Sequence, residues 1–207
     1  MDDARRVREF WFGKLPLGRD ALAARMRLWF AGEDSPELAQ ECDAALRAEF
    51  APRVEAALRG DLASWGDAPR RRLSLILLLD QFPRNIYRGR SRAFAGDEQA
   101  VSLALSGMQS GADAALDPVE RIFFYMPLQH CESIDVQDES VAAYRRLLRE
   151  AAQPLSDFFA EALKAAQRHA EIVRRFGRFP HRNRILRRDS THEEEDFVRQ
   201  GESFGQD

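Results

Sequence analysis

The sequence has little lysine, little cysteine and no long apolar run. Lys14 and Lys164 are the only lysines, so 29 of the 31 basic residues are arginine. Two cysteines are too few for a disulfide framework. The longest strongly apolar run, 75–79, is far too short to span a membrane, and the first 13 residues lack the apolar stretch of a secretion signal. We therefore expect a cytoplasmic protein with no membrane association.

The charge balance argues against a nucleic-acid partner. The formal net charge is -3, which creates no overall attraction to polyanions. Arginines are dense from 168 to 188, but an acidic run follows at 189–196, and we expect the two runs to neutralise each other. Hydrophobic residues make up 44% of the chain and charged residues 31%, a globular balance. No low-complexity linker divides the sequence, so residues 1–207 are expected to form one domain.

Apolar residues recur at spacings of three and four over most of the chain, which indicates amphipathic helices. The stretch 70–81 is apolar on nearly every side, so we expect a helix buried in the centre of the fold. Asp117-Pro118-Val119-Glu120 has the form of a helix start, with an N-cap, a proline in the first turn and a glutamate three residues on. No segment shows the alternation and hairpin glycines of paired strands. The fold class is therefore all-α, with helices expected at 37–58, 70–81, 97–110, 135–151 and 155–176, after Asp117, and near Ser190 or Thr191.

Prolines are expected to interrupt these helices, since proline removes a backbone donor and clashes with the preceding turn. Pro52 is predicted to kink or split the helix at 37–58. Phe82-Pro83 and Met126-Pro127 are predicted to end their helices, because a residue before proline avoids the helical region. Pro154 is expected to separate the last two long helices.

A short internal echo connects two parts of the sequence. The first segment, 82–88, reads Phe-Pro-Arg-Asn-Ile-Tyr-Arg, and the second segment, 179–187, reads Phe-Pro-His-Arg-Asn-Arg-Ile-Leu-Arg. Each follows a helix, and turns of one kind fall on the same edge in a stack of helical hairpins. We therefore predict that the two segments lie close together in space.

Polar residues gather at these helix ends and are the candidate site. The structural interpretation is that Arg84 and Asn85 cap unpaired carbonyls and that Asp80 pairs with Arg84. The functional interpretation is a set of donors aimed at an anion. In that hypothesis the carboxylates of Asp80 and Glu132 pair with the arginines when no ligand is bound. Substitution of Arg84 or Arg182 then weakens ligand binding more than it weakens folding. The candidate binding residues are Asp80, Gln81, Arg84, Asn85, Arg88, His130, Glu132, His169, Arg178, His181, Arg182 and Asn183.

Metal and nucleophile chemistry find little support. The histidine spacing matches no zinc signature, so no metal and no cofactor are expected. His130 and Glu132 are two residues apart and would not share one ion on a helix. Cys131 beside His130 is not a nucleophile–base pair, because that geometry is set in space rather than by adjacency.

Several motifs span nearly the whole chain: the stretches 7–12, 73–89, 120–127, 130–133 and 169–183. The longest reads Leu79-Asp80-Gln81-Phe82-Pro83-Arg84-Asn85-Ile86-Tyr87-Arg88-Gly89. Together they resemble DUF924, a family of uncharacterised bacterial proteins. The resemblance implies stacked antiparallel helical hairpins, similar to a tetratricopeptide-repeat superhelix with a concave face. It implies no established activity and no catalytic residue. The chain departs from the family pattern at Cys131, usually serine, and at His192, usually proline, so neither is expected to act.

Three hypotheses follow for function. The favoured one is a binding module that holds an anionic small molecule or a peptide end in a groove lined by arginine, asparagine and histidine. The second is a hydrolase in which a histidine acts as base, oriented by Asp80 or Glu132. The third is a structural role in which these residues only fasten helix ends, with a role in protein interaction. The sequence does not decide between enzyme and binding module, nor does it give the oligomeric state.

Overall fold

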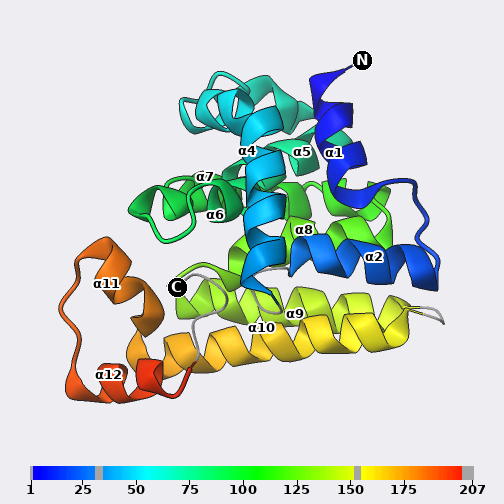
Figure 1. Ribbon diagram of the computed structural model, residues 1–207. Helices are drawn as coiled ribbons and strands as arrows, with labels where there is room; N and C mark the ends of the chain where they lie inside the picture. The colour runs from blue at the N-terminus through cyan, green and yellow to red at the C-terminus, as the bar shows by residue number, and fades with distance from the viewer. Residues whose placement is uncertain (1, 31–34, 152–154, 202–207) are drawn as a thin grey trace.

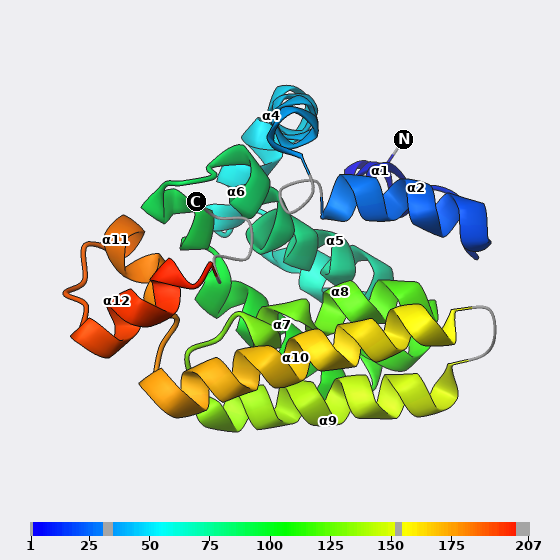
Figure 2. The same cartoon turned by 60° about the horizontal axis from the view of Figure 1, so that its bottom comes forward.

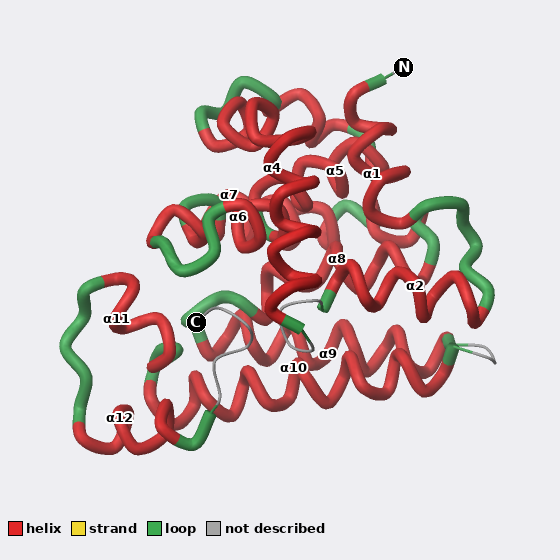
Figure 3. Tube along the Cα trace, viewed as in Figure 1, coloured by secondary structure: helices red, strands yellow, loops and turns green. Residues whose placement is uncertain are grey.

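The computed structural model describes residues 2–30, 35–151 and 155–201, and these residues form helices joined by turns (Figure 3). Within those ranges no strand occurs. The all-α fold class is thus confirmed, whereas superhelical stacking of the tetratricopeptide kind stays a prediction. The α-helices are α1 (Asp3–Phe12), α2 (Arg19–Trp29), α4 (Pro36–Leu58), α5 (Pro69–Leu79), α6 (Gln81–Ile86), α7 (Asp97–Gln109), α8 (Pro118–Gln129), α9 (Ile134–Glu150), α10 (Ser156–Phe176), α11 (Asn183–Leu186) and α12 (His192–Arg199).

The centre of the fold is α5, which packs against α1, α4, α7 and α8 (Figure 1). Every residue from 73 to 79 is buried. No side chain caps its first turn, so the helix is held by tertiary packing rather than by local signals. The predicted burial of 70–81 is confirmed over these residues.

A long helical hairpin, α9 and α10, runs along one side of the fold (Figure 2). Gly177 ends α10 in the left-handed region, at φ 71°, where a glycine carries no Cβ penalty. The chain then turns back as the C-terminal segment, residues 177–199, which contains α11 and α12. This segment has a small apolar core of its own, formed by Ile172, Val173, Phe179 and Phe197.

Three proline predictions need correction. Pro52 does not split α4, which runs unbroken from Pro36 to Leu58. Pro127 does not end α8, which continues to Gln129. Pro83 lies within the first turn of α6 rather than at the end of a helix, where its missing N–H is not needed. In α4 and α8, fully buried neighbours on both sides of the proline hold the helix: Phe50, Val54, Tyr125 and Leu128.

The predicted helix starts are confirmed. Asp117 and Glu120 form a reciprocal capping box at α8, and Thr191 and Glu194 form another at α12. Pro154, predicted to separate two helices, lies outside the described residues. No helix in the described part of the chain is long and apolar enough to cross a membrane.

Candidate functional site

Asp80 lies between α5 and α6 and is fully buried. Its Oδ1 atom is 2.6 Å from His130 Nδ1 and 3.0 Å from Arg84 Nη1, while Oδ2 accepts a hydrogen bond from Gln81 Nε2 at 2.5 Å. Burial raises the pKa of Asp80, but the charges of Arg84 and His130 and the hydrogen bonds outweigh it and hold the pKa well below its usual range. Asp80 is therefore an ionised carboxylate with both oxygens occupied.

His130 follows α8 directly and is oriented by Asp80. Since Asp80 is ionised, the short contact assigns the ring proton of His130 to Nδ1 and leaves the lone pair on Nε2. The pKa of His130 is lowered, first by burial and then by the charge of Arg84, although Asp80 opposes the shift. The ring is therefore neutral at pH 7 and accepts hydrogen bonds at Nε2.

The guanidinium of Arg84 is fully engaged by the protein. It donates to the backbone oxygen of Asp80 at 2.9 Å and to both carboxylate oxygens of Asp97 at 2.8 and 3.0 Å. Asp97 is the first residue of α7 and follows Gly96. A Cβ on Gly96 would lie 2.2 Å from the Leu79 carbonyl oxygen, so only glycine lets this turn approach α5 closely enough to place Asp97 there.

Arg182 is the contrasting arginine. Its guanidinium is buried, at 6% exposure, between the rings of Phe94 and Phe179 at 4.8 and 4.5 Å. Among the described residues its single hydrogen bond is a long one, from Nη1 to Asp97 Oδ2 at 3.4 Å, and its buried Nε has no acceptor. Burial, followed by the charge of Arg84, lowers the pKa of Arg182 to about 10. The group is still charged at pH 7, with donors that the protein leaves unused.

Two further histidines lie beside Arg182. The His169 ring is 6.0 Å from that of His130 and 5.6 Å from that of Phe179, and His181 lies 5.6 Å from Phe179 on centroid distances. His169 Nδ1 is 2.8 Å from the carbonyl oxygen of Ala165. Burial, then the neighbouring charge of His130 or Arg182, lowers the pKa of each histidine to about 3. Both rings are neutral at pH 7.

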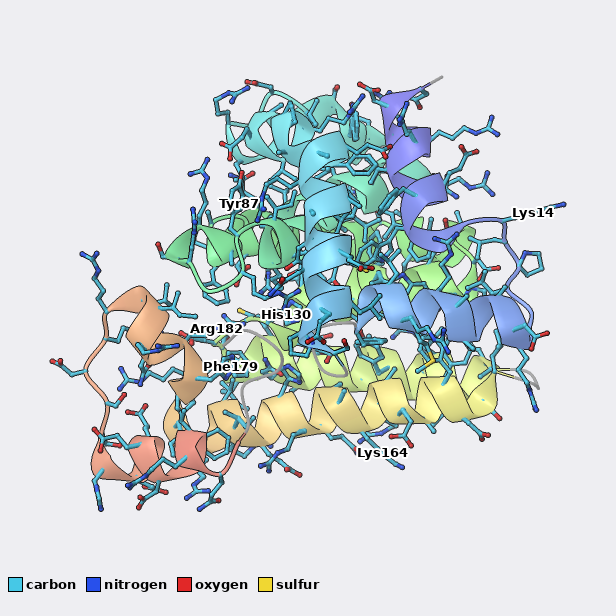
Figure 4. The ribbon with its side chains drawn as sticks, viewed as in Figure 1. Lys14, Tyr87, His130, Lys164, Phe179 and Arg182 are labelled. Atoms are coloured by element: carbon cyan, nitrogen blue, oxygen red, sulfur yellow. The ribbon has the colours of Figure 1, made fainter. Side chains whose placement is uncertain are left out.

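These residues form what we call the polar cluster: Asp80, Arg84, Asp97, His130, His169, His181 and Arg182. Figure 4 shows His130, Arg182 and Phe179 together where α8 ends, beside the start of the C-terminal segment. Arg84 and Arg182 both bind Asp97 and both lie over the ring of Phe94. The prediction that the first and second segments lie close together is thus confirmed.

Two candidates from the first segment turn away from the polar cluster. The amide of Asn85 donates to the Gln81 carbonyl at 3.2 Å, as the structural interpretation predicts. Arg88 donates to both oxygens of Asp43 on α4, at 2.8 and 3.0 Å, and to Asn85 Oδ1 at 2.8 Å. Asn85 thus bonds within α6, and Arg88 fastens the end of α6 to α4.

Three other candidates fasten the C-terminal segment. Glu132 accepts hydrogen bonds from the backbone N–H of Phe179 at 2.8 Å and from two nitrogens of Arg188 at 2.6 and 2.9 Å. It does not face Arg84 or Arg182 as an internal anion; Asp97 takes that place. Asn183 accepts from Arg188 Nε at 3.0 Å. Arg178 donates to both oxygens of Glu194 at 2.6 and 2.8 Å.

The C-terminal arginines are matched by acids, as the charge runs predict. Arg175 pairs with Glu193 and Arg178 with Glu194, both across the two runs.

The chain matches the profile of DUF924, described as a bacterial protein of unknown function, over residues 7–202. It belongs to the DUF924 family. A solved structure of a protein of unknown function from Agrobacterium tumefaciens is 34% identical to the chain, with a TM-score of 0.70. That match covers 89% of this chain and all of the other. A search of proteins with curated functions gives no match.

Sequence reasoning missed three members of this DUF924 site: Phe94, Asp97 and Arg188. Asp97 is an acid in the first turn of a helix, and an acid at that position usually stabilises the helix by interacting with its dipole. Phe94 lies in a 3-10 turn with no periodic pattern. Arg188 is the second of two consecutive arginines, and nothing in the sequence distinguishes the one that reaches Glu132.

Other features of this DUF924 chain lie outside the polar cluster. Burial raises the pKa of Cys131, so its thiol is protonated at pH 7 and is not an activated nucleophile. The described residues contain no group of three or more histidines, cysteines and acids placed to hold a metal ion. A groove beside α1 is lined by Arg8, Lys14 and Arg70, but Arg8 is already paired with the buried Glu120 at 2.6 Å.

Proposed function

We propose that this protein binds a small anionic ligand through Arg182, with the neutral histidines of the polar cluster around it. One observation carries the proposal: the buried guanidinium of Arg182 has donors without acceptors in the described part of the chain. A buried donor left unpaired costs about 1–3 kcal/mol, and more when charged. A ligand carboxylate or phosphate removes this cost, and its affinity comes from doing so.

The surroundings of Arg182 decide how the anion approaches. Phe94 and Phe179 both lie against the guanidinium, with Cζ 4.8 and 4.5 Å from the two ring centroids, and its hydrogen-bond donors lie in the guanidinium plane. Nη1 already points toward Asp97. The remaining edge, Nε with Nη2, has the parallel-donor geometry that binds a carboxylate or phosphate bidentately.

Arg84 has a different role, although it lies next to Arg182. Its hydrogen bonds to the Asp80 carbonyl and to both oxygens of Asp97 engage both of its terminal nitrogens. We therefore assign Arg84 to holding Asp80 and Asp97 in place, and restrict the anion site to Arg182.

The experiment compares the wild-type chain with Arg182→Met, which keeps the bulk between the two rings but removes the charge. Thermal shift and calorimetry are run against acetate, propionate, lactate, inorganic phosphate and a short peptide with a free C-terminal carboxylate. We expect at least one anion to bind the wild type and not the variant. Arg59→Met, which removes an exposed arginine paired with Asp61, is the matched control. Equal binding by wild type and Arg182→Met, or no binding by any anion, overturns the proposal.

General-base hydrolysis is a second candidate, supported by the Asp80–His130 pair. An ionised carboxylate that fixes the Nδ1 proton leaves His130 Nε2 to take a proton from water while the water oxygen bonds to an ester carbonyl carbon. The proton then passes to the departing alkoxide. Hydrolysis of p-nitrophenyl esters by the wild type, lost in His130→Ala, is the expected outcome; no hydrolysis above the buffer rate rejects this candidate.

The fastening hypothesis accounts well for the other candidates. Asn85, Arg88, Glu132, Arg178 and Asn183 all have partners within the fold. We propose that these five residues are structural. Of the candidate binding residues, we assign ligand binding to Arg182 and the three histidines of the polar cluster.

A further inference from the structure

We propose that the ligand of Arg182 carries a hydroxyl group beside its carboxylate, and that this hydroxyl donates a hydrogen bond to His130 Nε2. The ligand class is therefore a small hydroxycarboxylate. The inference rests on the proposed anion site and adds the second group that the ligand must present.

The first step is the fixed orientation of His130. Asp80 accepts from Nδ1 at 2.6 Å, and Asp80 itself is held by Gln81 at 2.5 Å and by Arg84 at 3.0 Å. A carboxylate surrounded by three donors stays ionised and can only accept. The ring proton of His130 is thereby held on Nδ1, and Nε2 presents a lone pair.

The second step is that His130 remains an acceptor at neutral pH. Its pKa is lowered by burial and by the charges of Arg84 and Arg182, against the opposing effect of Asp80. A protonated ring would place a third positive charge beside two buried guanidinium groups. Nε2 is therefore unprotonated under the conditions in which Arg182 is charged.

The third step is proximity. The ring of His169 lies 6.0 Å from that of His130 and 5.6 Å from that of Phe179, and Arg182 Cζ is 4.5 Å from the Phe179 centroid. Asp80 Oδ1 contacts both His130 and Arg84, and Asp97 contacts both Arg84 and Arg182. His130 and Arg182 thus belong to one connected group of side chains, and we place the ligand between them.

The fourth step concerns the chemistry of the ligand. A carboxylate accepts hydrogen bonds from Arg182 but has no proton to donate. Next to His130 Nε2, which is also an acceptor, it would form no hydrogen bond. An ammonium group would donate, but Arg84 and Arg182 would repel its positive charge. A hydroxyl donates without charge, and on the carbon next to a carboxylate it lies close enough for one small molecule to contact both groups.

The experiment uses matched ligand pairs on the full chain by calorimetry: lactate with propionate, and glycolate with acetate. We expect the hydroxy acid to bind about tenfold more tightly within each pair, because the acid without the hydroxyl gives Nε2 no hydrogen-bond donor. Alanine, which replaces the hydroxyl by an ammonium group, is expected to bind more weakly than lactate.

Two variants separate this role from a structural one. His130→Phe keeps an aromatic ring without the acceptor, so the lactate-to-propionate ratio falls to about one while propionate binding is retained. Asp80→Asn keeps the shape but can donate to Nδ1, which moves the ring proton to Nε2 and also removes the preference. The exposed His192→Phe is the matched control and leaves the ratio unchanged.

Nitrogen NMR of the histidine rings provides a readout that needs no ligand. We expect the His130 signals of the wild type to show protonated Nδ1 and bare Nε2 at pH 7, and this test stands even if His130→Phe fails to fold. Equal binding of lactate and propionate by the wild type overturns the inference while leaving the anion site intact. Failure of all four acids to bind overturns the inference, and it overturns the proposed function as well if phosphate and the peptide also fail to bind. A proton found on Nε2 rejects the hydroxyl contact.

Discussion

The first and second segments use the same local device for fastening. In each, the phenylalanine is fully buried. In each, an asparagine oxygen accepts from a following arginine, Arg88 to Asn85 and Arg188 to Asn183. That arginine also donates hydrogen bonds to both oxygens of a carboxylate elsewhere in the fold, Asp43 on α4 or Glu132 after α8. The contacts therefore repeat, although Arg188 lies one residue beyond the second segment, whose echo places Arg187 opposite Arg88.

The segments differ at the arginine between phenylalanine and asparagine. In the first segment an acid stands two residues before the phenylalanine, and Asp80 helps to saturate Arg84. In the second, the equivalent position is Gly177, which ends α10. Arg182 therefore has no acid nearby in its own segment and shares Asp97 at 3.4 Å. The arginine of the motif is paired where an acid is built in, and it has a buried Nε without an acceptor among the described residues where a glycine takes the place of that acid.

The largest expected effect comes from the different cores of the two phenylalanines. Phe82 packs on Trp11 and Phe50 in the main core, at centroid distances of 5.4 and 5.0 Å, whereas Phe179 belongs to the small C-terminal core. Phe82→Ala should lower the free energy of unfolding by about 3–5 kcal/mol in urea titrations. Phe179→Ala should instead increase hydrogen exchange mainly in residues 177–199. Identical exchange patterns for the two variants would contradict the division into two cores.

Substitution of the paired arginines tests the central difference. Arg84→Met should cost about 3–5 kcal/mol, because it leaves the buried carboxylate of Asp80 without its main counter-charge. Arg182→Met should cost less than about 1 kcal/mol, since it removes a buried charge that is poorly satisfied already. Urea unfolding of the two variants at pH 7 measures both losses of stability. Equal losses would mean that Arg182 is a fastener as well.

The two fastening arginines should have local effects of intermediate size. Arg188→Met removes two charge-assisted hydrogen bonds to Glu132 and one to the Phe179 carbonyl, at a cost of about 1.5–3 kcal/mol. Increased hydrogen exchange should centre on residues 177–190 for Arg188→Met and on α6 for Arg88→Met. Exchange that spreads through α5 in the Arg188 variant would show that the C-terminal segment is not a separate unit of stability.

The segments should also respond to pH in different ranges. His169 and His181, beside the second segment, have pKa values of about 3 when folded, against an ordinary value of 6.5. Below pH 6.5 the unfolded chain takes up protons that the folded chain does not, so stability is complete above this pH and falls as the pH drops toward 3. The slope is at most about 1.4 kcal/mol per pH unit for each histidine.

Urea unfolding at pH 7.5 and 5.5 measures this effect, and His169→Gln should reduce the difference between the two. Asp80, beside the first segment, has a lowered pKa, so its contribution is present above the ordinary carboxyl range and is lost only below about pH 4. Stability that is unchanged between pH 7.5 and 5.5 would contradict the buried, neutral state of the histidines.

Sequence patterns were sufficient for the buried helix and the caps. The apolar run at 75–79 must be buried, and it forms the buried part of α5. Asp117 and Glu120 interact within one helical turn. Both features therefore follow from residues that are neighbours in the sequence. The proline predictions for Pro52 and Pro127 failed because burial on both sides outweighed a lost backbone hydrogen bond. Local rules predict the local cost of a residue but not the packing that offsets it.

The candidate site was predicted as a neighbourhood but not as a set of roles. Arg84 and Arg182 both contact Asp97, which the close turn at Gly96 brings in, and Arg84 also contacts Asp80. Glu132 was expected to face the arginines of the cluster, but Arg188, 56 residues away, takes both its oxygens. Such roles depend on pairings between distant parts of the chain.

The polar cluster is assembled from three separate stretches of chain, 80–97, 130 and 169–182. The contacts of Glu132 with the Phe179 N–H and with Arg188 help to fasten the last of them. During synthesis from the N-terminus, the α5 core is complete in sequence long before this arginine leaves the ribosome. Domains fold as their residues emerge, so a nascent chain has its core before it has its site. A chain truncated before the C-terminal segment is therefore expected to accumulate as a folded protein that does not recognise the ligand.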